Sequence, residues 1–466
     1  MSAPADPRRE NPLEIVDRAM DRATGSRPIP GNRLTLLFDG PAIYPAMLER
    51  IAKASRTIHL DSYIFRSDET GRRFAEALAE RARAGVRVRI LTDWLGSVTT
   101  RPSLWRTLRQ AGASVRCFNP PRLLRLRDNI SRDHRKLLVV DGETAITGGH
   151  CIGNEWSGNP KAGRQPWRDT AIGIDGPAAS ALDRAFSVPW RSIGEPLEDL
   201  ELASDPAPQG DSQVRVVAGE PGGVRASRAT ELLLAGAAEK IWITDAYLVA
   251  PRHIYQAIID AARSGVDVRV LVPGKSDLPR IQSLTRIGYR DLLEAGVRIF
   301  EWRGPMLHAK TIVVDARWVR IGSTNLNLSS LLANFEIDVL TDDLPLAHAM
   351  EAQYRRDIDR SVEIKYRGDD TGRRRRALAA FPPAATMEGG RHRPSLRERR
   401  NRAAVTVWAL VSGARRTVFL QYSFALAVLG VSFLFLPRIM AAIFGFLSLW
   451  LAVATGLETW GRRPKG

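Results

Sequence analysis

Short β-branched runs alternate with amphipathic stretches along most of the first 360 residues. Residues 56–63 (RTIHLDSY) and 85–91 (GVRVRIL) predict strands, and residues 74–84 between them predict a helix. The same order of strand, helix and strand recurs over residues 240–271. This alternation is typical of an α/β sheet with helices packed on it.

The second stretch also repeats the first at the level of residues. RTIHLDSY at 56–63 corresponds to KIWITDAY at 240–247. Two copies of one plan predict pseudo-twofold halves that share something between them. We expect an N-terminal tail over residues 1–30, a first α/β domain over 31–205 and a second over 206–366.

An eight-residue motif is the strongest signal that the halves share. Residues 134–141 (HRKLLVVD) and 308–315 (HAKTIVVD) both read His-x-Lys-x-x-x-x-Asp and are offset by 174 residues. Alternate residues of a strand share a face, so the His and Lys of each copy should point into one cleft. An ammonium group neutralises phosphate oxygens, while an imidazole can attack phosphorus or transfer a proton. The predicted catalytic residues are His134, Lys136, His308 and Lys310.

Four carboxylates complete the predicted site. Asp141 and Asp315 close the two motifs just before a predicted turn, so a catalytic role and a purely structural role are both open for them. Asp169 and Glu336 each precede another β-type run later in their half. A surface charge at a strand start is the alternative reading for these two.

A carboxylate bonded to one imidazole nitrogen fixes the tautomer and leaves the other nitrogen free to react. We therefore assign each carboxylate to the histidine of its own half, Asp169 to His134 and Glu336 to His308.

The C-terminal end has a different character. Residues 417–436 and 439–457 are uncharged and mostly apolar, and about 20 such residues span a bilayer core. They predict a transmembrane helical hairpin within residues 406–466, with a buried helical pair of a soluble domain as the alternative. Arginine-rich flanks place both ends of the hairpin on the cytoplasmic side. The basic linker at 367–405, rich in Pro and Gly, could lie on anionic headgroups or remain solvated.

Composition narrows the class of protein. A hydrophobic content of 44% with 26% charged residues excludes a disordered or collagen-like chain. The two cysteines, Cys117 and Cys151, exclude a disulfide scaffold, and the N-terminus shows no secretory signal. From residue 361 onward, 18 Lys and Arg stand against 6 Asp and Glu, so +12 of the net charge of +17 lies there. A basic tail beside apolar segments indicates a membrane partner more than a nucleic acid.

At the duplicated motifs the sequence resembles the phospholipase D superfamily, and within it the cardiolipin synthase-like branch, over roughly residues 32–366. Softer support comes from DSYIF at 61–65, GGHCIGNEW at 148–156, GSTNL at 322–326 and NFE at 334–336. The resemblance implies two α/β/α sandwich domains with the active site at their interface. It also implies catalysis through a phosphohistidine, without metal or cofactor.

The resemblance further implies roles for single residues. His134 would be the nucleophile, and His308 would protonate the leaving alcohol and deprotonate the incoming one. The phosphoryl oxygens would be held by Lys136, Lys310, Asn325 and Ser323. The expected reaction moves a phosphatidyl group from phosphatidylglycerol to a second phospholipid alcohol, at an inner bacterial membrane and on its cytoplasmic side.

Two departures and three alternatives accompany this expectation. Cys151 stands where the family commonly has asparagine, and a thiol is a weaker donor than an amide. The predicted hairpin is C-terminal, whereas many cardiolipin synthases have an N-terminal one. A phospholipase D that hydrolyses lipids to phosphatidic acid is the first alternative, and a nuclease or other phosphodiesterase is the second. A noncatalytic membrane scaffold is the third, but both motifs are intact.

Overall fold

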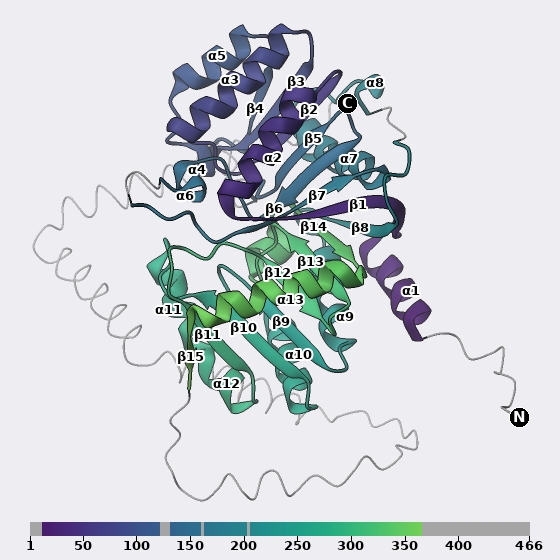
Figure 1. Cartoon of the computed structure of the whole chain (residues 1–466), viewed down its shortest axis with the longest axis vertical. Helices are drawn as coiled ribbons and strands as arrows, with labels where there is room; N and C mark the ends of the chain where they lie inside the picture. The colour runs from purple at the N-terminus through teal and green to yellow at the C-terminus, as the bar shows by residue number, and fades with distance from the viewer. Residues whose placement is uncertain (1–11, 122–130, 160–162, 203–205, 366–466) are drawn as a thin grey trace, which may run out of the picture. The chain divides into compact units, whose positions relative to one another are not determined.

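The computed structural model describes residues 12–121, 131–159, 163–202 and 206–365 (Figure 1). The strands of the first half are β1 (Ile29–Phe38), β2 (Thr57–Ser62), β3 (Arg87–Asp93), β4 (Ser114–Phe118), β5 (Lys136–Val140), β6 (Thr144–Gly148) and β7 (Thr170–Asp175). Those of the second half are β8 (Ser212–Gly219), β9 (Lys240–Thr244), β10 (Asp267–Pro273), β11 (Arg298–Trp302), β12 (Thr311–Val314), β13 (Trp318–Gly322), β14 (Glu336–Thr341) and β15 (Ser361–Ile364).

These strands form one sheet in which the two halves repeat the same topology. In the first half β4, β3 and β2 are parallel, and β5, β6, β7 and β1 follow as antiparallel neighbours. In the second half β11, β10 and β9 are parallel, and β12, β13, β14 and β8 follow in the same way. β1 pairs with β8 where the halves meet, through Ile29 with Val214 and Asn32 with Ser212. The predicted α/β fold with an internal repeat is confirmed.

Helices cover the sheet. They are α1 (Pro12–Thr24), α2 (Asp39–Lys53), α3 (Glu69–Arg83), α4 (Trp94–Ser97), α5 (Pro102–Gln110), α6 (Asn154–Ser157), α7 (Pro177–Ser192), α8 (Asp199–Leu202), α9 (Arg225–Ala235), α10 (Arg252–Arg263), α11 (Pro279–Ile287), α12 (Tyr289–Glu294), the π-helix Ser329–Ala333 and α13 (Leu344–Asp359). Local signals set their starts: the carboxylate of Asp68 accepts the Gly71 N–H at 2.9 Å and so caps α3.

Among the described residues, three large apolar cores and a smaller fourth one around Trp242 and Tyr354 hold the layers together. One packs α2, α3 and α5 on the first half of the sheet, and a second packs α9, α10 and α12 on the second half. The third core contains residues of both halves, among them Leu137 of β5, Phe186 of α7, Ile337 of β14 and Met350 of α13. Because this core is common to both halves, it fixes β5 relative to β14, where the site residues lie.

The N-terminal segment contains a helix that packs on the second half. Helix α1 packs on α9, with Met20 fully buried. Arg215 of β8 forms ion pairs with Asp17 at 3.2 Å and Asp21 at 2.5 Å. The ion-paired residues Asp17 and Arg215 are almost 200 residues apart in the sequence. No local sequence pattern therefore indicated that α1 packs on the second half.

Two further expectations concern the C-terminal end. In the described part of the chain, no helix combines the length and apolar character that crossing a bilayer requires. The predicted linker at 367–405 and hairpin at 406–466 lie outside the described residues.

The aspartates that close the two motifs make structural contacts, which favour the structural one of the two roles that the sequence leaves open. Asp141 lies at the far end of β5 and accepts the backbone N–H groups of Ser55, Arg56 and Thr57 at 2.7–2.9 Å. Asp315 accepts those of residues 238, 239 and 240, each at 2.8 Å. Five residues of strand separate Asp141 from Lys136, about 16 Å at 3.3 Å per residue. The aspartates therefore fasten the chain entering β2 and β9 to the end of the motif strand.

We expect Asp315→Ala to lower the free energy of unfolding by about 1 kcal/mol, as loss of a helix cap does, because three N–H groups lose their acceptor. The turnover of the folded fraction should stay within about twofold of wild type, since the carboxylate is remote from the site. Chemical denaturation in detergent and an activity assay measure the two effects. Asp315→Asn, which keeps one acceptor oxygen, is the control and should lose less stability. A large loss of turnover at unchanged stability would restore a catalytic role.

Candidate active site

Each motif histidine lies just before a strand, in a segment that pairs with the other half of the protein. The His134 N–H donates to the Phe335 carbonyl at 3.0 Å, and the Phe335 N–H donates to the Arg132 carbonyl at 2.9 Å. Likewise, the His308 N–H donates to the Arg168 carbonyl at 2.7 Å, and the Arg168 N–H donates to Met306 at 2.9 Å. Backbone pairing therefore ties each histidine to the opposite half.

The carboxylates bind the histidines in the reverse of the predicted order. His134 Nδ1 is 3.0 Å from Glu336 Oε1 and 3.1 Å from Oε2. His308 Nδ1 is 3.0 Å from Asp169 Oδ2. The assignment of Asp169 to His134 and of Glu336 to His308 is wrong.

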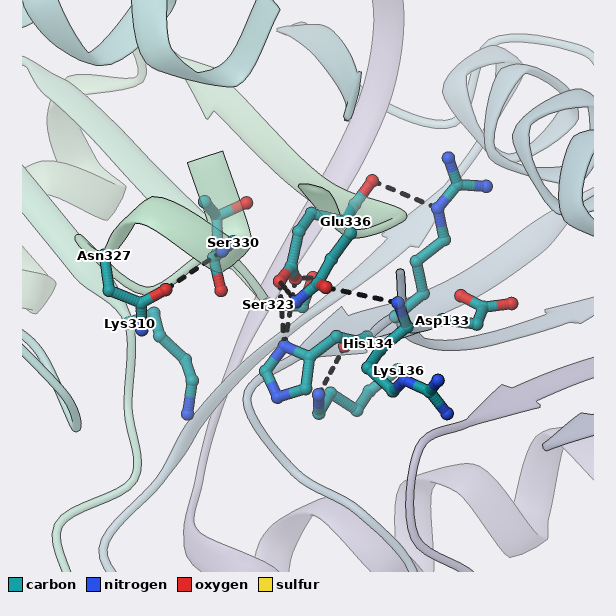
Figure 2. Close-up of polar contacts among 12 residues, drawn as sticks. Asp133, His134, Lys136, Lys310, Ser323, Asn327, Ser330 and Glu336 are labelled. Carbon is teal, nitrogen blue, oxygen red and sulfur yellow. Dashed lines mark hydrogen bonds and ion pairs between the residues drawn. The ribbon is translucent and has the colours of Figure 1, made fainter. Parts of the chain in front are cut away.

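The backbone pairing explains the exchange. Glu336 directly follows Phe335, which pairs beside His134, and Asp169 directly follows Arg168, which pairs beside His308. Each carboxylate is thereby presented to the histidine of the other half. Figure 2 shows Glu336 facing the Nδ1 side of the His134 ring.

These contacts set the protonation of the rings. A carboxylate at Nδ1 holds the proton on that nitrogen and leaves Nε2 as the reactive atom. The side chains of His134 and His308 are only 11% and 6% exposed. Burial lowers the pKa of each ring to about 4; Glu336 and Asp169 oppose that shift, and the neighbouring lysines reinforce it. Both imidazoles are therefore neutral at pH 7 in the absence of ligand.

The carboxylates themselves stay ionised. Burial acts to raise the pKa of Asp169, but the hydrogen bond and charge of His308 outweigh it and lower the value to about 2. The pKa of Glu336 is also lowered, because His134, Lys136 and the Ser323 hydroxyl outweigh its burial. Trp156 adds a second donor to Asp169, from Nε1 to Oδ2 at 3.0 Å.

The two lysines bring positive charge to the same place from both halves. Lys136 and Lys310 are buried, and each ammonium donates to the backbone carbonyl of its motif histidine. Lys310 acts on the pKa of His134 and Lys136 on that of His308, so the two motifs converge. In Figure 2 the ammonium groups of Lys136 and Lys310 and the His134 ring all point toward the bottom of the view. Burial lowers the pKa of Lys310 to about 8, and repulsion from Lys136 adds to that shift.

Of the remaining predicted phosphate contacts, Asn325 and Ser323 behave differently. Asn325 is buried, and its Oδ1 has no hydrogen-bond partner among the described residues. Ser323 donates its hydroxyl proton to Glu336 Oε2 at 2.5 Å and its N–H to the Ile337 carbonyl at 2.9 Å. A hydroxyl has one proton to donate, and in this structure Ser323 uses it to orient Glu336. A role for Ser323 as a phosphate ligand stays a prediction.

Cys151 occupies the place in the first half that Asn325 occupies in the second. It is buried, and burial raises the pKa of its thiol although Lys136 and Lys310 oppose that shift. The thiol is therefore protonated, which removes it as a rival nucleophile at neutral pH.

The site also includes two tyrosines that the sequence motifs did not indicate. The Tyr63 ring lies edge-on to His134 at 4.9 Å and 5.2 Å from the Lys136 ammonium. Tyr247 stands in the same relation to His308 and Lys310, at 5.9 Å from each. A signal was present, because both tyrosines stand at the same position of the repeated strand. Each half thus covers its histidine and lysine with one aromatic ring.

A buried carboxyl pair was also missed. Asp61 and Asp133 are buried beside Lys136 and Arg135, and within the described residues none of their four carboxyl oxygens accepts a hydrogen bond. Burial raises the pKa of both, that of Asp133 to about 7. His150 is buried nearby, and burial lowers its pKa to about 4, so it is neutral. Within the described residues, no group of three or more His, Cys, Asp or Glu side chains is arranged to hold a metal ion.

Comparison with known proteins places this site in a family. The family described as cardiolipin synthase, PLD-like domain matches residues 47–155 and 232–358, one segment in each half. The chain is therefore a member of the phospholipase D-like class of enzymes.

Its particular family follows from two relatives that match it over most of their length. The chain is 32% identical to the major cardiolipin synthase ClsA of Bacillus subtilis over 343 residues, 72% of this chain and 70% of that protein. It is 33% identical to cardiolipin synthase A of Pseudomonas aeruginosa over 353 residues, 74% of this chain and 71% of that protein. The chain belongs to the cardiolipin synthase family.

A solved structure supports the fold alone. The phosphatidylserine synthase of Haemophilus influenzae superposes with a TM-score of 0.59 at 16% identity, covering 76% of this chain and 92% of that one. The fold is thus shared with that protein.

The exchanged pairing makes a spectroscopic prediction. In protein with ¹⁵N-labelled histidine, Glu336→Gln should change the Nδ1 resonance and lower the pKa of His134 while leaving His308 unchanged, because the carboxylate is lost from one ring only. Asp169→Asn should do the reverse. His134→Gln and His308→Gln assign the two resonances by their disappearance. If Glu336→Gln changed His308 and spared His134, the pairing within each half would be restored.

Proposed function

We propose that the protein is a phosphatidyltransferase that moves a phosphatidyl group from phosphatidylglycerol to the hydroxyl of a second phospholipid and releases glycerol. The observation that supports it best is the pair of neutral, carboxylate-oriented imidazoles that two lysines accompany at the junction of the halves. Membership of the cardiolipin synthase family supports the choice of lipid substrate.

The charge of the site fits a phosphodiester. Two buried ammonium groups in one region repel each other and lower the pKa of each neighbouring imidazole. A phosphodiester carries one negative charge and would relieve that repulsion on binding. Its arrival would also raise the pKa of His308, which prepares that ring to hold a proton for a leaving alcohol. Asn325 would add an amide donor to the grip of the lysines.

The first half-reaction forms a covalent intermediate. The Nε2 lone pair of His134 attacks phosphorus, the bond from phosphorus to the glycerol oxygen breaks, and His308 gives that oxygen its proton. Glu336 stabilises the positive charge that develops on the His134 ring, as Asp169 does for protonated His308.

The second half-reaction reverses the roles of the atoms. His308, now neutral, takes the proton of the acceptor hydroxyl, whose oxygen attacks phosphorus. The bond between phosphorus and Nε2 breaks, and His134 returns to its neutral form. If water replaced the lipid hydroxyl, the product would be phosphatidic acid.

The location of the reaction is part of this proposal. The uncharged runs at 417–436 and 439–457 and their arginine-rich flanks support attachment to the inner membrane, with the catalytic halves on the cytoplasmic side. An anionic membrane surface would then be the protein's second partner besides its lipid substrates.

The central experiment incubates the full chain with phosphatidylglycerol in the presence of a chelator and resolves the lipids. A dimeric phospholipid plus glycerol is the expected product, whereas phosphatidic acid alone would reveal a hydrolase. His134→Ala should abolish both product and covalent intermediate. His308→Ala should slow turnover by about 10³-fold, the usual contribution of general acid–base catalysis, and accumulate intermediate from a substrate with a nitrophenol leaving group. Accumulation in His134→Ala instead would reverse the two roles.

The pKa values predict the pH profile. Since burial lowers the pKa of Lys310 to about 8, kcat/KM should fall about tenfold per pH unit above that value as the ammonium loses its charge. Lys310→Arg keeps the charge, so its decline should begin at higher pH although its rate is lower. Rates measured from pH 6 to 10 in wild type and variant test this. A wild-type decline that begins only near pH 10 would contradict it.

A further inference from the structure

Large apolar side chains are exposed around the active site. Nine of them are exposed among the described residues, and six lie in segments that follow the site-bearing ends of β3, β10 and β13. We name these six the apolar rim: Leu95, Val98, Leu278, Leu284, Ile287 and Leu328. Each is between 48% and 61% exposed. Of the other three, Val224 precedes α9, Leu344 begins α13 and Val362 lies in β15.

In the first half the rim is fastened to the residues that cover His134. Leu95 lies in α4, and Val98 directly follows this helix. The Asp93 side chain caps α4 by accepting the Leu95 N–H at 2.8 Å. The Ser97 hydroxyl donates to the carbonyl of Tyr63 at 3.2 Å. The Tyr63 ring in turn contacts the His134 ring, so Tyr63 connects this part of the rim to the proposed nucleophile.

The second half repeats the arrangement around His308. The Tyr247 hydroxyl donates to Oδ1 of Asp277, the residue before Leu278, at 2.8 Å. The Asn327 amide donates to the Tyr247 carbonyl at 3.4 Å, directly before Leu328. Tyr247 lies on His308, so both parts of the rim are bound to the tyrosine of their own half. Figure 1 places α4 and α11, one from each half, at the left of the view.

Positive charge accompanies these apolar groups. Arg101, Lys275 and Arg280 are exposed in the same segments. On α11, Leu284 and Ile287 are three residues apart and therefore share one face of the helix. Apolar side chains next to exposed cations suit the interface of an anionic bilayer, where the former enter the headgroup layer and the latter bind lipid phosphates.

We infer that the apolar rim is the surface on which the two catalytic halves dock on an anionic phospholipid bilayer, so that lipid headgroups pass directly to the paired histidines. This inference rests on the proposed function, because it assumes that the substrates lie in a bilayer. A bilayer is favoured over a second copy of the chain because the rim surrounds the residues that cover both histidines, and a protein partner there would obstruct the lipid.

The first test separates docking from chemistry. The substitutions Leu278→Ser, Leu284→Ser and Ile287→Ser are combined in the full chain, and transfer is measured with phosphatidylglycerol in vesicles and with dispersed dihexanoyl phosphatidylglycerol below its micellar concentration. We expect a loss of at least tenfold on vesicles and a change of less than twofold on the dispersed lipid. The matched control, Leu344→Ser with Val362→Ser, removes exposed apolar groups outside the rim and should change neither rate. Equal losses on both substrates, or no loss on vesicles, would overturn the inference.

A second test needs no activity. Cys117, which is exposed, is replaced by Ser, while the buried Cys151 stays. A nitroxide on Leu284→Cys in the full chain, reconstituted into vesicles containing phosphatidylglycerol, should be more accessible to oxygen than to a nickel complex. A nitroxide on Leu344→Cys should show the opposite preference.

Equal preferences at the two positions would refute docking on the bilayer. Broadening of the Leu284→Cys signal that disappears on dilution with unlabelled protein would refute it too, by showing a second copy on the rim. If the wild type transfers neither form of phosphatidylglycerol, the proposed function fails, while the accessibility measurement still decides the inference.

Discussion

Four backbone hydrogen bonds between the halves determine the chemistry of this protein. They run in two pairs, between the His134 segment and Phe335 and between the His308 segment and Arg168. Because Glu336 and Asp169 directly follow those partners, each imidazole is oriented by a carboxylate that the other half supplies. Neither half alone contains an oriented histidine. The duplicated fold therefore brings the two motifs together in one candidate site, which both halves build.

The electrostatics of the site follow from the same convergence. Buried charges are costly unless they are paired, and here two carboxylates are paired with imidazoles. The two ammonium groups contact histidine carbonyls and the tyrosine rings, and Lys310 Nζ also lies 3.0 Å from His308 Nδ1. Burial lowers the pKa of both histidines and of Lys310, and the charge of the neighbouring ammonium groups adds to that shift. An anionic phosphodiester would complete the balance, so the binding of substrate and the protonation of His308 are linked. Tyr63 and Tyr247 pack against the two histidines, and the apolar core common to both halves supports the strands that carry the charged groups.

The sequence predicted what is encoded in periodicity and repetition. The strands near residues 57 and 240, the helices after them and the two motifs all follow from local patterns that tertiary packing reinforces. The partner of each histidine could not be found in this way, because Asp169 and Glu336 precede equivalent strands and the sequence spacing favours neither pairing. The contacts of Asp141 with Thr57 and of Ser323 with Glu336 depend on which way a side chain turns at a strand end, which the sequence pattern does not indicate. Tyr63 and Tyr247 could have been found, since both stand in the repeated strand.

The most direct test of the account is a structure of the protein with vanadate and glycerol, which together mimic a phosphoryl group during transfer. One vanadium atom should be bonded to Nε2 of His134, with the glycerol oxygen opposite and within hydrogen-bond distance of Nε2 of His308. Lys136 and Lys310 should both contact its remaining oxygens. Two anions bound separately, one at each motif, or a single anion that reaches only one half would contradict the central claim.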